Sequence, residues 1–564
     1  MIYGECSSAG AGGQDERMLL TETGLIFRGV KPLLRLGSIT KDMAIGDFFP
    51  QLALAPRAPD QLRIIPPDAW PGDAARGRDM VSGLFSFAGQ TIERENLSWK
   101  PEGATAEWIA ALHGFEWLRD LRSVGGERAR RMARDMVALW IESYPKFDQT
   151  AWRADITGAR LASWIAFYGF FCATADETFR KNYFSSLARQ ARYLARALPG
   201  SLTGLPLMHA LRGLAYAGLA LEGGDARLEQ AFGIIIKQIK EQILPDGSHI
   251  SRSPQQAFEF LQCLVDLRTA LIAAKLEMPE ELQHAIDRIT PAIKFFRHGD
   301  GSLAQFNGGQ EGNAHLCDVT LMRSAARGRA MKSLPQGGYE RICQGRSSLI
   351  MDTGVPLSSG YSDRAHAGLL SIEYSYGRDR VFVNCGTSGV DGKWQRVLRS
   401  TLAHSALAVD SRNACQINGE GPLFSYPHVR ASRQENADIA LIDAVHDGYM
   451  PRFGLNYTRR VQLQDMGETL RGEEQLSGRT GVPFAVRFHV HPDIYASLED
   501  GAVMLCAKSG LCWRFSAAGA DVSIEESVYV GTDENPVPTL QIVLSGQTGM
   551  SPTIVRWETS RESI

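Results

Sequence analysis

The sequence predicts a protein of two main parts, a helical N-terminal half followed by an antiparallel β part. Three observations predict this fold class. The chain has 564 residues, which is too long for one hydrophobic core. Apolar residues recur with a helical period from about residue 104 to 290. From about residue 337 the period changes to two, and short turns separate the segments.

The helical part consists of apolar stretches separated by Gly, Pro or Asp clusters. Trp108, Leu112 and Phe115 begin the pattern with i, i+3/i+4 spacing. Further helices are expected over residues 129–144, 158–173, 178–198, 204–221, 228–243, 255–276 and 280–296. Their short connections predict antiparallel hairpins, and the absence of a fixed sequence period argues against a regular solenoid. We therefore expect an α/α toroid, an incomplete barrel of helical hairpins.

The second part alternates between strand-like segments and turns. Strands are expected over residues 347–352, 369–376, 380–384, 406–410, 439–443, 458–464, 468–476, 484–491, 502–506, 512–516 and 539–545. This pattern is typical of an antiparallel β-sandwich. We predict an N-terminal extension, partly disordered, over residues 1–60, a toroid over 61–335 and a sandwich over 336–564. A concave helical domain beside a sandwich forms a cleft, where ligands preferentially bind.

Composition excludes several classes of protein. The net charge of −3 gives no basic excess for binding a nucleic acid backbone. The apolar runs are too short to span a bilayer. Because the N-terminus has no basic region followed by an apolar run, a cytoplasmic protein is expected, or a periplasmic one if the natural start differs. The nine cysteines are scattered, and no C-x-x-C pair occurs, which favours buried free thiols.

The helical half offers two polar motifs. Residues 245–256 form a polar loop that enters a helix, where the dipole favours anions, although helix capping alone would also explain the pattern. Residues 296–309 contain two Gly-rich turns, which an ordinary hairpin exit would also explain. The candidate ligand groups are His249, Arg252, Gln255, Arg297 and Asn307.

The sandwich offers two further motifs. His366 lies in a loop before the strand that carries Tyr374, although a tyrosine on a sandwich face is more often part of the core. Arg399 precedes His404, which opens another strand, and such arginines can pair with carboxylates in a bidentate manner or simply be solvated. His446 is an additional candidate.

These stretches resemble the heparinase II/III-like family, especially its bacterial branch. The matching segments are residues 67–73, 113–118, 245–256, 297–309, 365–386, 399–410, 446–474 and 487–492. They occur in order over most of the chain. The family fold is an α/α toroid followed by a β-sandwich, and its enzymes are polysaccharide lyases acting on uronate-containing chains.

The resemblance implies a site for β-elimination, in which a base removes the C5 proton of a uronate whose carboxylate has been neutralised. Gln255 lies nearest the position of the family's neutralising residue, and His404 resembles the histidine that opens the sandwich strand. The expected catalytic residues are His249, Gln255, His366, Tyr374 and His404, and the expected substrate-binding residues are Arg252, Arg297, Asn307 and Arg399. The helical and sandwich sets should converge across the cleft.

Some family members hold a structural zinc through sandwich His and Asp residues. His404 and His446 are therefore the first candidates for zinc ligands, and no other cofactor is predicted. The chain departs from the family because residues 295–309 contain no Tyr, where the lyases carry a catalytic one. Gly368 and Tyr457 also replace a frequent Asp and His.

The leading hypothesis is a lyase whose partner is an anionic polysaccharide or oligosaccharide. A second hypothesis is a non-catalytic glycan-binding or envelope-polysaccharide assembly protein of the same fold. A third, a glycoside hydrolase, needs two acidic residues across the cleft, for which Asp246 and Asp300 are available.

Overall fold

The computed structural model describes residues 59–93, 98–355, 359–361, 364–388, 392–417, 427–436, 439–532 and 535–562. Residues Arg57–Ile564 form one compact unit, and the fold given below is that of this unit. The extension predicted for residues 1–60 lies almost entirely outside the described residues.

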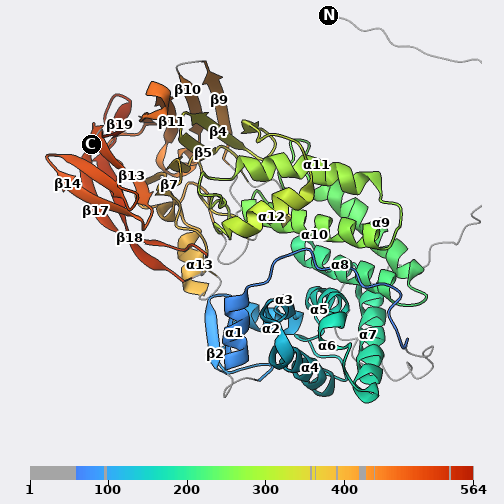
Figure 1. Ribbon diagram of the computed structural model, residues 1–564. Helices are drawn as coiled ribbons and strands as arrows, with labels where there is room; N and C mark the ends of the chain where they lie inside the picture. Colours follow the sequence, from blue (N-terminus) through green and yellow to red (C-terminus); the bar gives the residue numbers. More distant parts are fainter. Residues whose placement is uncertain are drawn as a thin grey trace, which may run out of the picture. The chain divides into compact units, whose positions relative to one another are not determined.

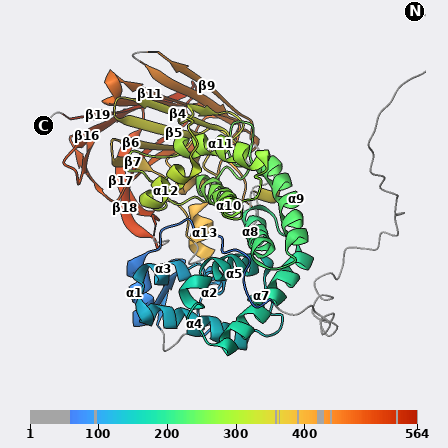
Figure 2. The same cartoon turned by 45° about the vertical axis from the view of Figure 1, so that its right-hand side comes forward.

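Helices make up the first half of this unit, and Figures 1 and 2 show them from blue to yellow-green. Their bounds are α1 Ala74–Ser82, α2 Ala106–Gly114, α3 Leu118–Val124, α4 Gly126–Ser143, α5 Ala154–Ala166, α6 Tyr168–Phe171, α7 Glu177–Ala197, α8 Gly204–Ala220, α9 Asp225–Gln242, α10 Pro254–Ala273, α11 Glu280–Phe295 and α12 Ala314–Ser324. Helices α5 and α8, α8 and α9, and α10 and α11 pack against each other. The predicted helical half is confirmed, with an added hairpin of β1 Leu84–Phe87 and β2 Gln90–Glu93.

The start of α10 shows how local sequence places a helix that carries a predicted site residue. The Ser253 side chain accepts a hydrogen bond from the backbone N–H of Gln256, and Pro254 occupies the first turn. Ser at the cap and Pro at the first helical position are both favoured there, because the first N–H groups have no partner within the helix. This cap fixes where α10 begins and therefore places Gln255 in its first turn.

The second half consists of two antiparallel sheets. The eight-stranded sheet has the order β14-β15-β16-β19-β12-β11-β10-β9, and the other has the order β17-β18-β13-β7-β6-β5-β4-β3 with β8 paired to β13. The bounds are β3 Ser333–Leu334, β4 Tyr339–Gln344, β5 Ser347–Asp352, β6 Ile372–Tyr376, β7 Asp379–Val383, β8 Leu407–Val409, β9 Val429–Glu435, β10 Ala440–His446, β11 Leu455–Gln464, β12 Thr469–Gly478, β13 Pro483–Val490, β14 Ile494–Glu499, β15 Ala502–Ala507, β16 Cys512–Ala518, β17 Asp521–Tyr529, β18 Val537–Gln547 and β19 Thr553–Arg561. Two short helices, α13 Gly392–Leu398 and α14 Met450–Phe453, complete the half.

One hydrophobic core joins the two sheets. It contains Leu349 and Phe488 from one sheet and Val461 and Trp513 from the other, so the sheets pack face to face as a sandwich. Strand β11 alternates between buried and more exposed residues, as expected when one face is solvated. The predicted antiparallel sandwich is therefore confirmed.

Strands β5 and β6 are buried on both faces, unlike β11. One face meets the sandwich core, and the other meets the loops of the helical half. There the Nδ1 of His298 lies 2.9 Å from the Ser375 hydroxyl, and its Nε2 lies 2.9 Å from a carboxylate oxygen of Glu373. The Arg341 guanidinium donates to the backbone carbonyl oxygens of Lys294 and Phe295. The polar face of β6 is thus the contact surface between the two halves.

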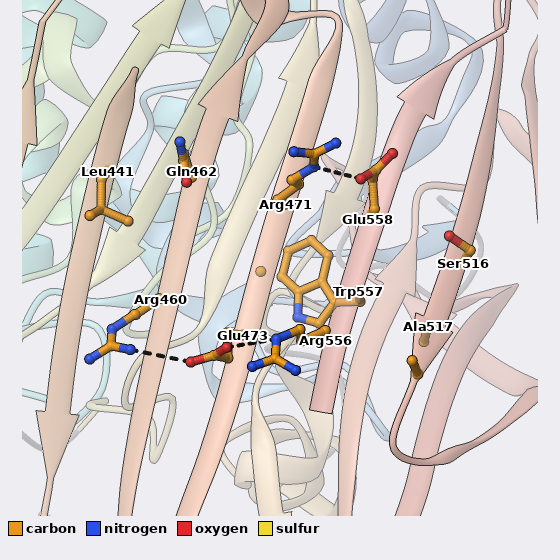
Figure 3. Close-up of a pocket in the computed structure, with 12 residues that line it drawn as sticks. Leu441, Arg460, Gln462, Arg471, Glu473, Ser516, Ala517, Arg556, Trp557 and Glu558 are labelled. Atoms are coloured by element: carbon orange, nitrogen blue, oxygen red, sulfur yellow. Dashed lines mark hydrogen bonds and ion pairs between the residues drawn. The ribbon is translucent and has the colours of Figure 1, made fainter. Parts of the chain in front are cut away.

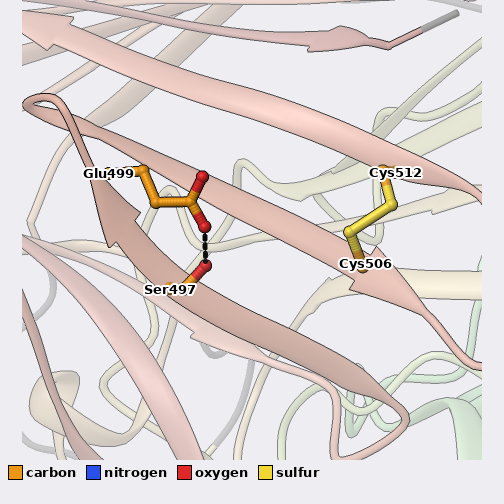
Figure 4. Close-up of a disulfide and its surroundings, with 4 residues drawn as sticks. All are labelled: Ser497, Glu499, Cys506 and Cys512. Carbon is orange, nitrogen blue, oxygen red and sulfur yellow. Dashed lines mark hydrogen bonds between the residues drawn. A yellow bond between two sulfur atoms is a disulfide. The ribbon is translucent and has the colours of Figure 1, made fainter. Parts of the chain in front are cut away.

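The cysteines differ in part from the prediction of buried free thiols. Cys506 and Cys512, directly opposite on β15 and β16, form a disulfide (Figure 4). Cys343 is free but exposed. The remaining described cysteines are buried free thiols, namely Cys172, Cys263, Cys317, Cys385 and Cys415. Spacing alone could not reveal the disulfide, because the pairing depends on the register of a hairpin. No described helix is long and apolar enough to cross a lipid bilayer.

Candidate active site

A cavity of about 360 Å³ lies where the helical half meets a segment that follows β5. The helical half contributes side chains from α8, α10 and the start of α5, and the sandwich half contributes Gly360, Tyr361 and Arg364. The polar side chains that line it are Arg153, Asp155, Thr203, His209, Gln255, Gln256, Glu259, Tyr361 and Arg364. Gln255 is the one predicted catalytic residue in this lining.

Two predicted histidines form a pair beside this cavity. The Nδ1 of His366 lies 3.2 Å from the Nε2 of His404, and the Nδ1 of His404 lies 2.7 Å from the Ser400 carbonyl oxygen. A carbonyl oxygen only accepts, so the Nδ1 of His404 carries the hydrogen. When both rings are neutral, the Nε2 of His404 accepts from the Nδ1–H of His366. The Nε2 of His366 then keeps a free lone pair.

That lone pair lies close to Gly308, a residue of the cavity lining, although His366 itself is not part of the lining. Gly308 lines the cavity, and a Cβ placed on Gly308 would lie 3.6 Å from the Nε2 of His366. Among the described residues, no group other than His404 and Asn307 hydrogen bonds to His366. Gly308 has a φ of +72°, which favours glycine, and its missing side chain leaves the imidazole nitrogen accessible.

Hydrogen bonds and packing hold this histidine pair in place. Asn307 accepts a hydrogen bond from the backbone N–H of His366, and Arg399 donates to the carbonyl oxygen of Ala365. The ring of His404 packs on Gly368, where a Cβ would come within 2.7 Å of the His404 Cδ2. This contact gives a physical reason for glycine where the family often has Asp.

Two residues predicted to bind substrate prove to be structural, which corrects the interpretation of their motifs. Arg252 forms a buried ion pair with Asp352 on β5 and donates to the Gly337 carbonyl oxygen at 2.7 Å. The amide nitrogen of Asn307 donates to the Tyr339 hydroxyl at 2.6 Å and to Asp352 at 3.2 Å. Both side chains make their polar contacts at the junction between the two halves.

Arg399 is buried as well, so it clamps the loop of His366 rather than facing a substrate. The Arg297 guanidinium donates to the Gly301 carbonyl oxygen and pairs with Asp318, and it does not line the cavity. The predicted substrate-binding set is therefore not gathered at the cavity.

Two predicted catalytic residues also lie away from the cavity. Both ring nitrogens of His249 are engaged, by Ser251 at 2.7 Å and Gln242 at 3.0 Å, inside the helical half. The Tyr374 hydroxyl lies 2.9 Å from the Ser347 hydroxyl, and its ring belongs to the sandwich core. The core position of Tyr374 agrees with the alternative stated for it above, whereas the local sequence pattern did not reveal the packing role of His249.

Gln255 remains at the cavity with a fixed orientation. Its amide nitrogen donates to Glu259 at 2.9 Å, and its amide oxygen accepts from the backbone N–H of Gln310 at 3.1 Å. An amide nitrogen carries two hydrogens, so one stays available for a ligand.

Of the lining residues that the sequence reasoning missed, His209, Tyr361 and Arg364 carry groups suited to acid–base chemistry or anion binding. The side chain of exposed Arg364 makes no ion pair with any described residue. The Tyr361 hydroxyl donates to Glu241 on α9 at 2.8 Å. His209 lies on α8 and lines the cavity together with residues of α10 and α5. An isolated His, Tyr or Arg carries no sequence signal, because only the packing of distant segments brings these residues together.

The arrangement does not fit the zinc implied by the resemblance. Both nitrogens of His404 are engaged, by His366 and Ser400. His446 accepts from the Gly448 N–H at 3.1 Å, and its Nε2 is buried without a partner. Within the described ranges, no three His, Cys, Asp or Glu side chains gather closely enough to hold a metal ion.

The acidic pair considered for a glycoside hydrolase is also engaged in the framework. Asp246 accepts from the backbone N–H groups of Gln336 and Gly337, and Asp300 pairs with Arg380 at 2.7 Å. Neither carboxylate lines the cavity.

A second hollow of about 590 Å³ lies on the outer face of the eight-stranded sheet (Figure 3). Its charges pair with one another across strands: Arg460 and Arg556 both contact Glu473, and Arg471 contacts Glu558. No predicted site residue lines it. Cross-strand pairs of this kind are typical of a solvated sheet face.

Buried histidines should make the fold sensitive to acid. Burial lowers the pKa from 6.5 to about 4 for His404 and His446 and to about 3 for His249. The unfolded chain therefore binds more protons below pH 6.5, and each histidine removes about 1.4 kcal/mol of stability per pH unit down to its folded pKa. We expect the urea midpoint to fall steadily from pH 7 to pH 5, and a constant midpoint over this range would contradict the burial of neutral histidines.

Comparisons with known proteins agree with this architecture. The model of the heparinase II/III N-terminus matches residues 74–324, and that of the heparinase II/III-like C-terminal domain matches residues 326–558. FtsZ-localized protein C of Caulobacter vibrioides (strain NA1000 / CB15N) is 30% identical over 502 residues, covering 85% of this chain and 86% of that protein.

Two solved structures share the fold. Heparinase III superposes with a TM-score of 0.71 at 14% identity, covering 86% of this chain and 84% of that one. Heparan sulfate lyase HepC from Pedobacter heparinus gives a TM-score of 0.56 at 13% identity, covering 87% and 83%. The helical half and sandwich thus correspond to the α/α toroid and β-sandwich of heparinase III.

Proposed function

Because the chain belongs to the heparinase II/III-like family, we propose that it is a polysaccharide lyase that cleaves a uronate-containing anionic glycan by β-elimination. The observation that carries the proposal is the free Nε2 lone pair of His366 beside a polar cavity. A neutral imidazole close to a substrate site can act as a general base. It supplies the function of the toroid Tyr that this chain lacks.

The first requirement is to make the C5 proton of the uronate acidic. Arg364 and the unused amide hydrogen of Gln255 both lie in the cavity lining, where they can hydrogen bond to the uronate carboxylate. Neutralising that carboxylate stabilises the negative charge that develops as the proton leaves.

The elimination needs a base and an acid, and we assign these two roles to His366 and Tyr361. The Nε2 of His366 takes the C5 proton, and the C–H electron pair forms the C4–C5 double bond. The bond from C4 to the glycosidic oxygen breaks, and its electron pair leaves with that oxygen. Tyr361 is the tyrosine in the lining, and its hydroxyl can return a proton to the leaving oxygen.

Tyr361 suits the role of acid. Burial, together with its hydrogen bond to Glu241, raises the pKa of Tyr361 above its ordinary value of 10, so the hydroxyl keeps its proton. We expect Tyr361→Phe to lower kcat by about 10²- to 10⁴-fold with little change in stability. Tyr495→Phe is the matched control, because Tyr495 is 70% exposed on β14. Unchanged kcat in Tyr361→Phe would exclude Tyr361 as the acid.

The reaction itself is tested by incubation with a panel of uronate polymers, including alginate, polygalacturonate, chondroitin and heparan sulfate. β-Elimination leaves an unsaturated uronate, so ultraviolet absorbance should rise with at least one polymer. Absence of absorbance with every polymer, together with measurable binding of one of them, would favour the non-catalytic alternative.

That alternative, a glycan-binding or envelope-assembly protein, is favoured by one specific comparison. The relative that is 30% identical over 502 residues is named for its localisation with FtsZ rather than for an enzymatic activity. If this chain acts similarly, a fluorescent fusion should co-localise with FtsZ even when His366 is replaced by Ala. Uniform distribution of the fusion would argue against this role.

A further inference from the structure

Three arginines lie on one side of α7 and form a surface that the proposed reaction does not use. Arg189, Arg192 and Arg196 are spaced i, i+3 and i+7, so they share one side of the helix over about 10 Å of its length. The Gln230 amide nitrogen of α9 donates to the Ala195 carbonyl oxygen at 2.8 Å, which places the start of α9 beside the end of α7. We call the three arginines the arginine stripe. None of them lines the cavity of the proposed active site.

The positive charges of the arginine stripe have no carboxylate partners. No described residue forms an ion pair or a hydrogen bond with these side chains, and the Nε atoms of Arg189 and Arg192 are buried without partners. Burial and the neighbouring Arg192 lower the pKa of Arg189, and burial and Arg196 lower the pKa of Arg192. Arg227, in the first turn of α9, adds a fourth charge, because burial and Arg192 lower its pKa more than Asp225 raises it. The guanidinium groups therefore repel one another.

Two carboxylates on neighbouring helices do not neutralise the stripe, because each is paired with another arginine. Asp225 on α9 pairs with Arg63 at 3.4 Å. Helix α5 also packs against α7, and Asp155 at its start pairs with Arg153 at 2.8 Å. Like charges three or four residues apart destabilise the helix that carries them. An acidic partner from outside the described residues would remove this repulsion.

An aromatic pair borders the arginine stripe. Tyr193 lies four residues after Arg189 on the same side of α7, and its ring centroid is 5.9 Å from that of Phe147. Phe147 is 37% exposed. Arginine, tyrosine and phenylalanine are all enriched at the contact surfaces of proteins, and a planar guanidinium binds a carboxylate with two hydrogen bonds. The surface thus combines groups that recognise carboxylates with groups that recognise apolar side chains.

We propose that the arginine stripe and the Phe147–Tyr193 pair form a docking surface for an acidic polypeptide segment that also carries apolar side chains. The carboxylates of such a segment pair with the guanidinium groups, and its apolar side chains pack on the two rings. A nucleic acid or an anionic bilayer fits less well, because the chain has a net charge of −3 and no overall attraction for a large polyanion. A uronate polymer offers carboxylates but no hydrocarbon side chains.

Fluorescence anisotropy on the full chain tests this surface with a labelled peptide in which Glu alternates with Leu. A peptide of the same length with Gln in place of Glu is the matched probe, and we expect it not to bind. Combining Arg189→Gln, Arg192→Gln and Arg196→Gln should weaken binding of the Glu-Leu peptide about tenfold, because each exposed ion pair contributes roughly a factor of two. Phe147→Ala should weaken the Glu-Leu peptide but leave a Glu-Gly peptide unaffected.

The matched control removes the same charge elsewhere, by Arg78→Gln, Arg323→Gln and Arg329→Gln, since these arginines are exposed and lie outside α7 and α9. We expect this variant to bind the Glu-Leu peptide as the unmodified protein does. An equal loss in the control would reduce the effect to net charge and overturn the proposal. Equal binding of the Glu-Leu and Gln-Leu peptides would overturn it as well.

Two further measurements separate docking from other roles. The urea midpoint of the triple variant of the arginine stripe should equal or exceed that of the unmodified protein, because like-charge repulsion is removed. A lower midpoint would make the stripe structural and refute the proposal. Alginate and vesicles containing phosphatidylglycerol are tested against the same variants. If either bound through the stripe while the Glu-Leu peptide did not, the partner would be a polyanion of another class and the proposal would fail.

Discussion

Replacement of His366 by Ala is expected to lower lyase kcat by about 10²- to 10⁴-fold, because it removes the group that takes the C5 proton. The side chains of Asn307 and Arg399 hold this loop through hydrogen bonds to the backbone of residues 366 and 365, and these bonds remain in the variant. Product formation is measured by ultraviolet absorbance with the polymer that the unmodified protein cleaves. Added imidazole should restore part of the activity, which a merely structural role would not allow.

The pH profile gives an independent check of the same residue. Burial lowers the pKa of His366 well below 6.5, with further contributions from His404 and Arg399. The imidazole is therefore neutral at pH 6.5, and the acid limb of kcat/KM should lie below this value rather than at it. Exposed His284 serves as the control in His284→Ala. Full activity of His366→Ala would exclude this histidine as the base.

Replacement of Arg252 by Ala is expected to cost about 3–5 kcal/mol of unfolding free energy, because it leaves the Asp352 carboxylate buried without its counter-charge. Arg252 and Asp352 are 4% and 3% exposed. The change also removes the donor to the Gly337 carbonyl oxygen. Urea denaturation at pH 7.5 measures the loss, and a double variant, Arg252→Met with Asp352→Leu, should recover much of it.

Arg130→Ala is the matched control, since Arg130 pairs with Glu127 on the exposed face of α4. Its loss should cost less than about 1 kcal/mol. If Arg252→Ala weakened glycan binding while leaving the urea midpoint unchanged, Arg252 would be a substrate-binding residue, as its sequence motif suggested, and the structural assignment would be wrong.

The sequence by itself determined the fold class and several element boundaries. The helical period before residue 290 and the alternation after residue 337 reflect local backbone geometry. They can therefore be recognised in the sequence without knowledge of tertiary contacts. Ser253 and Pro254 marked the start of α10 for the same reason, because capping depends on neighbours within one turn. The strands that the sequence did not predict include β9, β14, β17 and β19.

Only the tertiary structure decided which polar residues share a site. The motif around Arg252 has the composition of an anion site, but its partner Asp352 lies 100 residues away, and the ion pair turns the motif into a structural junction. His366 and His404, 38 residues apart, become a donor–acceptor pair only when two segments of the sandwich half fold together. His209 and Tyr361 reach the cavity from opposite halves. Periodicity describes neighbours along the chain, whereas desolvation and charge pairing depend on neighbours in space, so the site became visible only in the folded chain.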